Sequence, residues 1–207
     1  REAGCSSDGG PDGDTDGGVP AAWKLLVYLN ADNDLETMFF HDMNELEEGG
    51  SDANVIVLVQ ADRIEGYASN DGDWTEARRY RIVEDHDDTA IASEVLEELG
   101  EVDMGDPATL VDFVAWAESL HPTEHTALII WDHGDSWLKG GGGGPTKEFS
   151  YDDTSGSGIS VADGEYSSAL SSIEEILGEP LDLIGFDACT VAAWETAMVS
   201  AEHVRVQ

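Results

Sequence analysis

The segments TALIIWDHG (residues 126–134) and DLIGFDAC (residues 182–189) share one design: an apolar run of strand length ends in polar, reactive side chains. Apolar runs without alternation are typical of strands that are buried on both faces of a parallel sheet. Ligands bind beyond the carboxyl ends of the strands in such sheets. We therefore expect His133 and Cys189 to reach the same edge of one sheet.

The rest of the chain alternates between strand and helix signals. Strands are predicted at Lys24–Asn30, Asn54–Gln60, Thr126–Trp131 and Asp182–Phe186, and helices at Asp34–Glu48, Asp106–Leu120, Ser167–Leu177 and Ala192–Ser200. Weaker signals predict an edge strand or hairpin arm at Arg79–Val83, a short helical piece at Ser93–Leu99 and a glycine-rich loop over 138–160. Strands separated by helices predict an α/β fold, a three-layer α/β/α sandwich with a mostly parallel sheet.

Composition limits the functions that this chain can have. Acidic residues outnumber basic ones by 45 to 9, which gives a formal net charge of −36 and argues against binding to nucleic acid or to an anionic membrane surface. No run approaches the 18 consecutive apolar residues that a membrane-spanning helix needs, so no such helix is expected in this sequence. Residues 1–22 are rich in Gly and Asp and are predicted to be a flexible acidic tether, so that the folded domain covers residues 23–207.

The two loops carry the parts needed for acyl transfer. A cysteine acts as a nucleophile in its thiolate form, and Cys189 is expected near the N-terminus of the helix that follows, where the dipole favours an anion. His133 is the candidate proton carrier, and the backbone N–H groups of Gly134 and Cys189 are candidates to hold an oxyanion. The alternative is that Cys189 is a small buried apolar residue and His133 a structural one.

The sequence resembles the clostripain family of cysteine peptidases, which are related to caspases, legumains and gingipains. The matching segments are WKLLVYLNADNDLE (23–36), GEVDMGDPATLVDFVAWAESLHP (100–122), ALIIWDHGDSW (127–137), SYDDTSG (150–156) and IGFDACTVAAWETA (184–197). The resemblance implies a caspase-like fold and a Cys189–His133 dyad in a cysteine endopeptidase.

The resemblance also implies cleavage after Arg or Lys in a peptide or protein substrate, with Asp187 in the pocket for the basic side chain. A carboxylate two residues before the nucleophile suits that role, since it favours a cationic side chain over a neutral one. The alternative is that Asp187 caps the following helix.

Self-cleavage between His133 and Cys189 is a further implication. Lys147 and Lys139 lie in the intervening loop, next to the run GGGGGP, and are the candidate processing sites. The alternative is that both are incidental lysines of a surface loop.

Three features depart from the family pattern. Asp135 and Thr190 stand where relatives carry other residues, and only 18 residues follow Cys189, so we expect a fold that is truncated at its C-terminus. They support an alternative function, a catalytically inactive binding module with a caspase-like fold that is tethered to the cell envelope.

Cofactors and location are less constrained. The chemistry requires no cofactor; calcium is kept open, because the surface is anionic and the resembled family often depends on it, but no ligand set is assigned. Residues 3–5 (AGC) resemble the end of a bacterial lipoprotein signal, so Cys5 is either a lipidation site or a free thiol. Either way, an extracellular or bacterial-envelope location is expected, with any membrane contact made through the anchor. The segment HPTEH (121–125) matches a zinc-peptidase pattern, but Pro122 prevents the continuous helix that this motif needs.

Overall fold

Strands and helices alternate along most of the chain in the computed structural model, which describes residues 21–134 and 148–206. The strands are β1 (Trp23–Ala31), β2 (Val55–Arg63), β3 (Ala77–Arg81), β4 (Glu94–Gly100), β5 (His125–Trp131), β6 (Glu148–Asp152), β7 (Ser157–Ser160), β8 (Leu181–Asp187) and β9 (Val204–Val206). The helices are α1 (Glu36–Gly49), α2 (Pro107–Leu120), α3 (Glu165–Leu177) and α4 (Trp194–His203).

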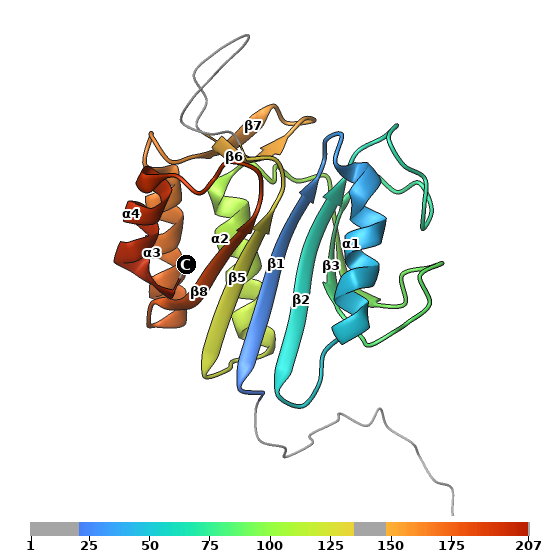
Figure 1. Ribbon diagram of the computed structural model, residues 1–207, viewed down its shortest axis with the longest axis horizontal. Coiled ribbons are helices and arrows are strands. Elements are labelled where there is room, and N and C mark those ends of the chain that lie inside the picture. The colour runs from blue at the N-terminus through green and yellow to red at the C-terminus, as the bar shows by residue number, and fades with distance from the viewer. Residues whose placement is uncertain (1–20, 135–147, 207) are drawn as a thin grey trace, which may run out of the picture.

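One seven-stranded sheet forms the centre of the fold, in the order β4-β3-β2-β1-β5-β8-β9 (Figure 1). The five neighbours β2-β1-β5-β8-β9 pair in parallel, whereas β3 pairs antiparallel with both β2 and β4. The carboxyl ends of β1, β2, β5 and β8 therefore lie at the same edge of the sheet. The mostly parallel sheet predicted from the sequence is confirmed.

Helices cover both faces of the sheet, which confirms the three layers. One buried cluster joins the sheet to α2 and α3 through residues such as Tyr28, Phe113 and Leu170, whereas a second joins the opposite face to α1 through Phe39 and Met43. Figure 1 shows α1 on one face of the sheet and α2 behind it, with α3 and α4 together at the β8 side. Alternate residues of β1 belong to different clusters, because successive side chains of a strand point to opposite faces.

The segment predicted as a short helical piece at Ser93–Leu99 is instead strand β4, so that prediction was wrong. Its Glu and Leu residues favour a helix in isolation, but cross-strand contacts decide the outcome. Arg79 of the neighbouring strand β3 pairs with Glu97 at 2.9 Å. Strand β3, predicted as an edge strand or a hairpin arm, is an arm and lies inside the sheet, while β4 forms the exposed, acidic edge.

The glycine-rich loop predicted over 138–160 contains a two-stranded hairpin, β6–β7, in its described part. The hairpin forms because Phe149 and Ile159, paired across it, are both buried. The Phe149 ring packs edge-on against Tyr166 of α3, with 5.2 Å between the ring centroids. Strand β9, which follows α4 directly, has no counterpart among the predicted elements.

Helix α2 begins and ends where the sequence indicates. Asp106 is its N-cap and accepts a hydrogen bond from the amide of Ala108, and Pro107 occupies its first turn. The helix ends at Leu120, so the HPTEH segment lies outside it, as expected from Pro122. His125 instead opens β5 and pairs with Asp182, at 3.2 Å.

Candidate active site

The loops that carry His133 and Cys189 leave the sheet side by side. Trp131 of β5 and Asp187 of β8 are paired in register as the last residues of two parallel neighbours. One step further, the amide of Asp132 donates a hydrogen bond to the carbonyl of Asp187, at 3.2 Å. The predicted meeting of the two loops at one edge of the sheet is thus confirmed.

Gly134 and Thr190 join the two loops beyond the strands. The Thr190 hydroxyl donates a hydrogen bond to the Gly134 carbonyl, at 2.9 Å. A Cβ atom added at Gly134 would lie 2.1 Å from the carbonyl oxygen of Cys189 and 2.2 Å from Val191, so a side chain does not fit there. Thr190 has a φ of 58°, a left-handed conformation that is rare for a β-branched residue. The backbone directly after Cys189 is therefore held in a strained turn by a contact with the His133 loop.

The imidazole of His133 is bound by a residue that the sequence analysis missed. Its Nε2 lies 2.6 Å from Oδ1 of Asp34, which follows β1, the strand next to β5. Both side chains are exposed, by 48% and 66%. The signal in the sequence was the acidic run after a third buried strand of the same sheet, in ADND (31–34).

Cys189 is an exposed, free cysteine on the loop after β8. The following helix α4 begins at Trp194 with Ala193 as its N-cap, so Cys189 lies four positions before the cap. Three loop residues separate Cys189 from this cap, and the proximity of its sulfur to the helix N-terminus stays a prediction. The alternative of a buried structural cysteine is wrong, because Cys189 is exposed.

Asp132, between β5 and His133, is almost completely buried. Burial raises the pKa of its carboxyl to about 7, although hydrogen bonds from His133 and Asn33 and the charge of His133 favour the ionised form. The side-chain nitrogen Nδ2 of Asn33 donates hydrogen bonds to Oδ1 of Asp132, at 2.7 Å, and to the carbonyl of Tyr151. Asn33 thus connects the His133 loop to β6.

Asp187 is exposed at the end of β8 and is not a helix cap, since Ala193 caps α4 without a side-chain bond. It borders a cavity of about 320 Å³ between the sheet and α1. The cavity wall is apolar along β1 and β5, and its other acidic members are Asp42 and Glu45 of α1. Asp42 accepts a hydrogen bond from Nε1 of Trp131, at 2.6 Å. Burial raises the pKa of Asp42, and the charges of Glu45 and Asp187 raise it further, against that hydrogen bond.

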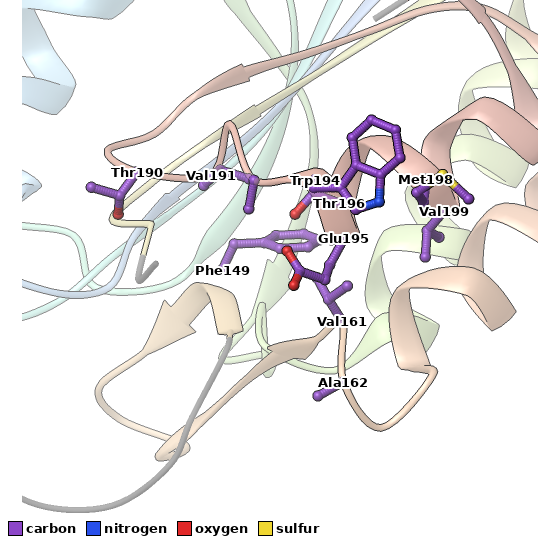
Figure 2. A pocket seen from close by; sticks show the side chains of 11 residues that line it. Phe149, Val161, Ala162, Thr190, Val191, Trp194, Glu195, Thr196, Met198 and Val199 are labelled. Carbon is purple, nitrogen blue, oxygen red and sulfur yellow. The ribbon is translucent and has the colours of Figure 1, made fainter. Parts of the chain in front are cut away.

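A second cavity, of about 370 Å³, adjoins the Cys189 loop (Figure 2). Val191 and Trp194 line it from the loop and the start of α4, and Phe149 lines it from the hairpin. Trp194 is 76% exposed. An apolar hollow therefore adjoins Thr190, the residue after Cys189.

Two groups of side chains in the described part of the chain have the spacing of metal ligands. One consists of His41, Asp42 and Glu45 on α1, of which His41 and Glu45 are exposed and Asp42 is half-buried; the other consists of Asp32, Asp62, Glu101 and Asp152. Neither set was predicted from the sequence. Three of the four members of the second set are buried, although acidic residues are rarely buried without a partner.

Several predicted features lie outside the described residues: the processing candidates Lys139 and Lys147, the lipidation candidate Cys5, and Asp135. None of the helices in the described part of the chain combines the length and the apolarity needed to cross a lipid bilayer.

Comparison with known proteins agrees with this architecture. The clostripain family model matches residues 27–204. Clostripain from Hathewaya histolytica is 26% identical to this chain, over 84% of the chain and 35% of that protein.

Two solved structures share the fold. A secreted C11 cysteine protease from Bacteroides thetaiotaomicron, in complex with an irreversible peptide inhibitor, superposes with a TM-score of 0.67 at 21% identity, over 89% of this chain and 47% of that one. An inactive zymogen of a C11 protease from Parabacteroides distasonis gives a TM-score of 0.62 at 22% identity, over 90% and 47%. The chain thus spans about a third to a half of the length of these relatives. Because the family model covers most of its residues, the chain belongs to the clostripain family of cysteine peptidases.

Proposed function

We propose that this protein is a cysteine endopeptidase that hydrolyses peptide bonds after Arg or Lys, with Cys189 as nucleophile and His133 as proton carrier. The observation that carries the proposal is the junction of the two loops. The bond from Thr190 to Gly134 and the close packing of Gly134 on the Cys189 carbonyl hold the histidine loop against the cysteine loop at the open edge of the sheet.

In the proposed reaction, the Cys189 thiolate forms a C–S bond with the substrate carbonyl carbon, and the C=O electron pair moves to the oxygen. The amides of Gly134 and Cys189 donate hydrogen bonds to this oxyanion. As it collapses, the C–N bond breaks and the His133 imidazolium gives its proton to the leaving amine. Water then attacks the thioester, His133 takes its proton, and the carboxylate product leaves as the thiolate returns.

Asp34 is a positioning residue in this scheme. Since Asp34 occupies Nε2 of His133, Nδ1 is the nitrogen that remains for the thiol and the leaving amine. The carboxylate lies beside the ring that carries the positive charge when the amine departs. The arrangement follows the general pattern of a nucleophile, a base and a third group that orients the base.

The cavity bordered by Asp187 suits a long basic side chain. Apolar residues of β1 and β5 would contact the methylene groups of Lys or Arg, while Asp187 and Asp42 would face the charged end. The charge of Asp187 raises the pKa of Asp42, so the two carboxylates repel each other. This supports a shared role in binding the basic side chain, because a cation between them relieves the repulsion. A neutral side chain leaves that repulsion in place.

An irreversible thiol-directed probe that bears Arg tests the proposal against the alternative of an inactive binding module. The peptidase is expected to be labelled at Cys189 and to hydrolyse fluorogenic peptides that end in Arg or Lys, and Cys189→Ala is expected to lose both. A matched probe with Glu in place of Arg should label poorly. Absence of labelling in a chain that still binds the peptide would support the binding module.

We further propose self-cleavage after Lys147 or Lys139. The Parabacteroides distasonis relative, described as an inactive zymogen, is consistent with processing in this family. A denaturing gel of the active chain should resolve two fragments, and Cys189→Ala should remain intact. One intact band from the active chain would contradict the proposal.

An extracellular or envelope location is proposed as well. The Bacteroides thetaiotaomicron relative is described as secreted, and Cys5 would add a lipid anchor. Radiolabelled fatty acid incorporated by the bacterial host into the parent, but not into Cys5→Ser, would support the anchor.

A further inference from the structure

Four carboxylates from four separate segments converge at the carboxyl edge of the sheet. Asp32 follows β1, Asp62 lies near the end of β2, Glu101 follows β4 and Asp152 ends β6. One oxygen from each lies within 4.8 Å of the others. Asp32, Asp62 and Asp152 are at most 1% exposed, whereas Glu101 faces solvent. In this group, which we call the acidic edge cluster, three carboxylates are thus buried and one is exposed.

Protein hydrogen bonds satisfy only part of this cluster. Oδ1 of Asp32 accepts from the amide of Thr154, and Oδ1 of Asp62 accepts from the amide of Arg63. The second oxygen of each, Oδ2, is buried and has no hydrogen-bond partner. Leaving a buried acceptor unpaired costs about 1–3 kcal/mol, and more for a charged group. Two such oxygens in one cluster indicate a missing partner.

No basic side chain in the described ranges supplies that partner. Arg63 is adjacent in sequence, but its guanidinium pairs with Glu36 and donates to backbone carbonyls of 68–72. None of the ion pairs among the described residues involves a member of the cluster. The buried carboxylates of Asp32, Asp62 and Asp152 therefore have no cationic partner among the described side chains.

We propose that the acidic edge cluster binds one hard divalent cation, and that calcium is the ion it fits. Calcium takes oxygen ligands at about 2.3–2.6 Å, so two ligands on opposite sides of the ion are about 4.6–5.2 Å apart. The spread of the four oxygens, up to 4.8 Å, agrees with that span. Magnesium usually takes one or two carboxylates and keeps several waters, whereas here four carboxylates are already assembled.

A cation in this cluster would tie the β6–β7 hairpin to the sheet. The carbonyl of Asp32 already accepts from the amide of Asp153, and Oδ2 of Asp152 accepts from the amide of Met104. On the same hairpin, Phe149 forms a β-bridge with Gly134, the residue after His133. Binding would therefore stabilise the hairpin first and, through Gly134, the histidine loop. The proposal does not rest on peptidase activity, since it concerns binding and stability.

The test uses the full chain carrying Cys189→Ala, which removes self-cleavage, after treatment with chelator. Isothermal titration with calcium chloride is expected to give one saturable site, and calcium is expected to raise the melting temperature. Asp62→Asn should weaken binding at least tenfold and remove most of the shift, while melting no lower than the parent without calcium, because it relieves repulsion. Glu101→Gln, at an exposed position that tolerates substitution, should weaken binding several-fold.

Asp88→Asn is the matched control, since Asp88 is exposed and lies outside the cluster. It removes the same charge and should bind calcium as the parent does. Equal weakening by Asp88→Asn and Glu101→Gln would mean diffuse attraction to an anionic surface and would overturn the proposal. Equal affinity in the parent, Asp62→Asn and Glu101→Gln, or no saturable binding by the parent at millimolar calcium, would overturn it too.

Discussion

Oδ1 of Asp34 lies 2.6 Å from Nε2 of His133, across the gap between the ends of two neighbouring strands. Because both side chains are largely exposed, this pair adds little to the stability of the fold. Its effect is to fix which imidazole nitrogen is free and where the ring points. A contact with little value for stability at a candidate active site is best explained by orientation.

Replacing Asp34 by alanine should therefore lower kcat roughly tenfold or more, with little change in KM or in melting temperature. Asp34→Asn, which keeps an acceptor oxygen, should recover part of the lost rate. Steady-state kinetics on an Arg-ended fluorogenic peptide, together with thermal melts, measure these effects. Unchanged kcat in Asp34→Ala, or a fall in melting temperature that accounts for the loss, would remove the positioning role.

Asp187→Ala should change substrate selectivity more than turnover. The carboxylate borders the cavity assigned to the basic side chain, so its loss should lower kcat/KM for Arg and Lys peptides by about a hundredfold, while a matched norleucine peptide changes little. Asp88→Ala, at an exposed position away from the cavity, serves as the control. A uniform loss on all three peptides would mean that Asp187 supports the loop rather than the pocket.

The sequence was sufficient to predict the part of the fold that depends on buried apolar runs. TALIIW and DLIGF are apolar runs of strand length that predict inner strands of a parallel sheet, and a reactive residue follows each of them, so the meeting of the His133 and Cys189 loops could be expected. Strand β4 could not be predicted in the same way. Its sequence SEVLEELG favours a helix locally, and it is a strand because it pairs with β3, whose Arg78 and Arg79 lie opposite its glutamates.

The acidic partners escaped prediction for another reason. Because the chain has 45 acidic residues, an Asp that follows a strand cannot be distinguished by sequence from the many other acidic residues. Asp34 is distinguished by its contact with His133, and the acidic edge cluster by its burial, and both belong to the tertiary structure. By contrast, the chain has only two Cys and six His, so a Cys and a His that each follow an apolar strand could be identified as a candidate dyad.

Asp132 gives the protein a pH dependence with a definite sign. The folded chain keeps its proton up to about pH 7, whereas an unfolded chain loses it near pH 4. Between these values the folded state binds the extra proton, so the contribution of Asp132 lowers the free energy of unfolding as pH rises, by at most about 1.4 kcal/mol per pH unit. Above pH 7 this dependence ends.

Asp132→Asn should remove that contribution while keeping an acceptor oxygen for Asn33. The free energy of unfolding of the variant minus that of the parent should rise from pH 4 to pH 7 and stay constant above pH 7. Urea unfolding at a series of pH values, in chains carrying Cys189→Ala, measures the difference between the two. Parallel profiles over the whole range would show that Asp132 ionises at its ordinary pKa in the folded chain.

Gly134→Ala tests the junction of the two loops directly. The new methyl group would lie 2.1 Å from the Cys189 carbonyl oxygen and 2.2 Å from Val191, so the loops must separate to accommodate it. Gly134 is not among the residues with positive φ, so the penalty is steric rather than conformational. Separation of this size should lower kcat/KM by about a hundredfold, because misplacement by 1 Å is enough to disrupt a reacting pair. Destabilisation should be about 1–3 kcal/mol.

Gly49→Ala is the control: a Cβ there meets nothing within 4 Å at the end of α1, and both activity and stability should be kept. If Gly134→Ala retained full activity, the close contact of the two loops would have no part in catalysis.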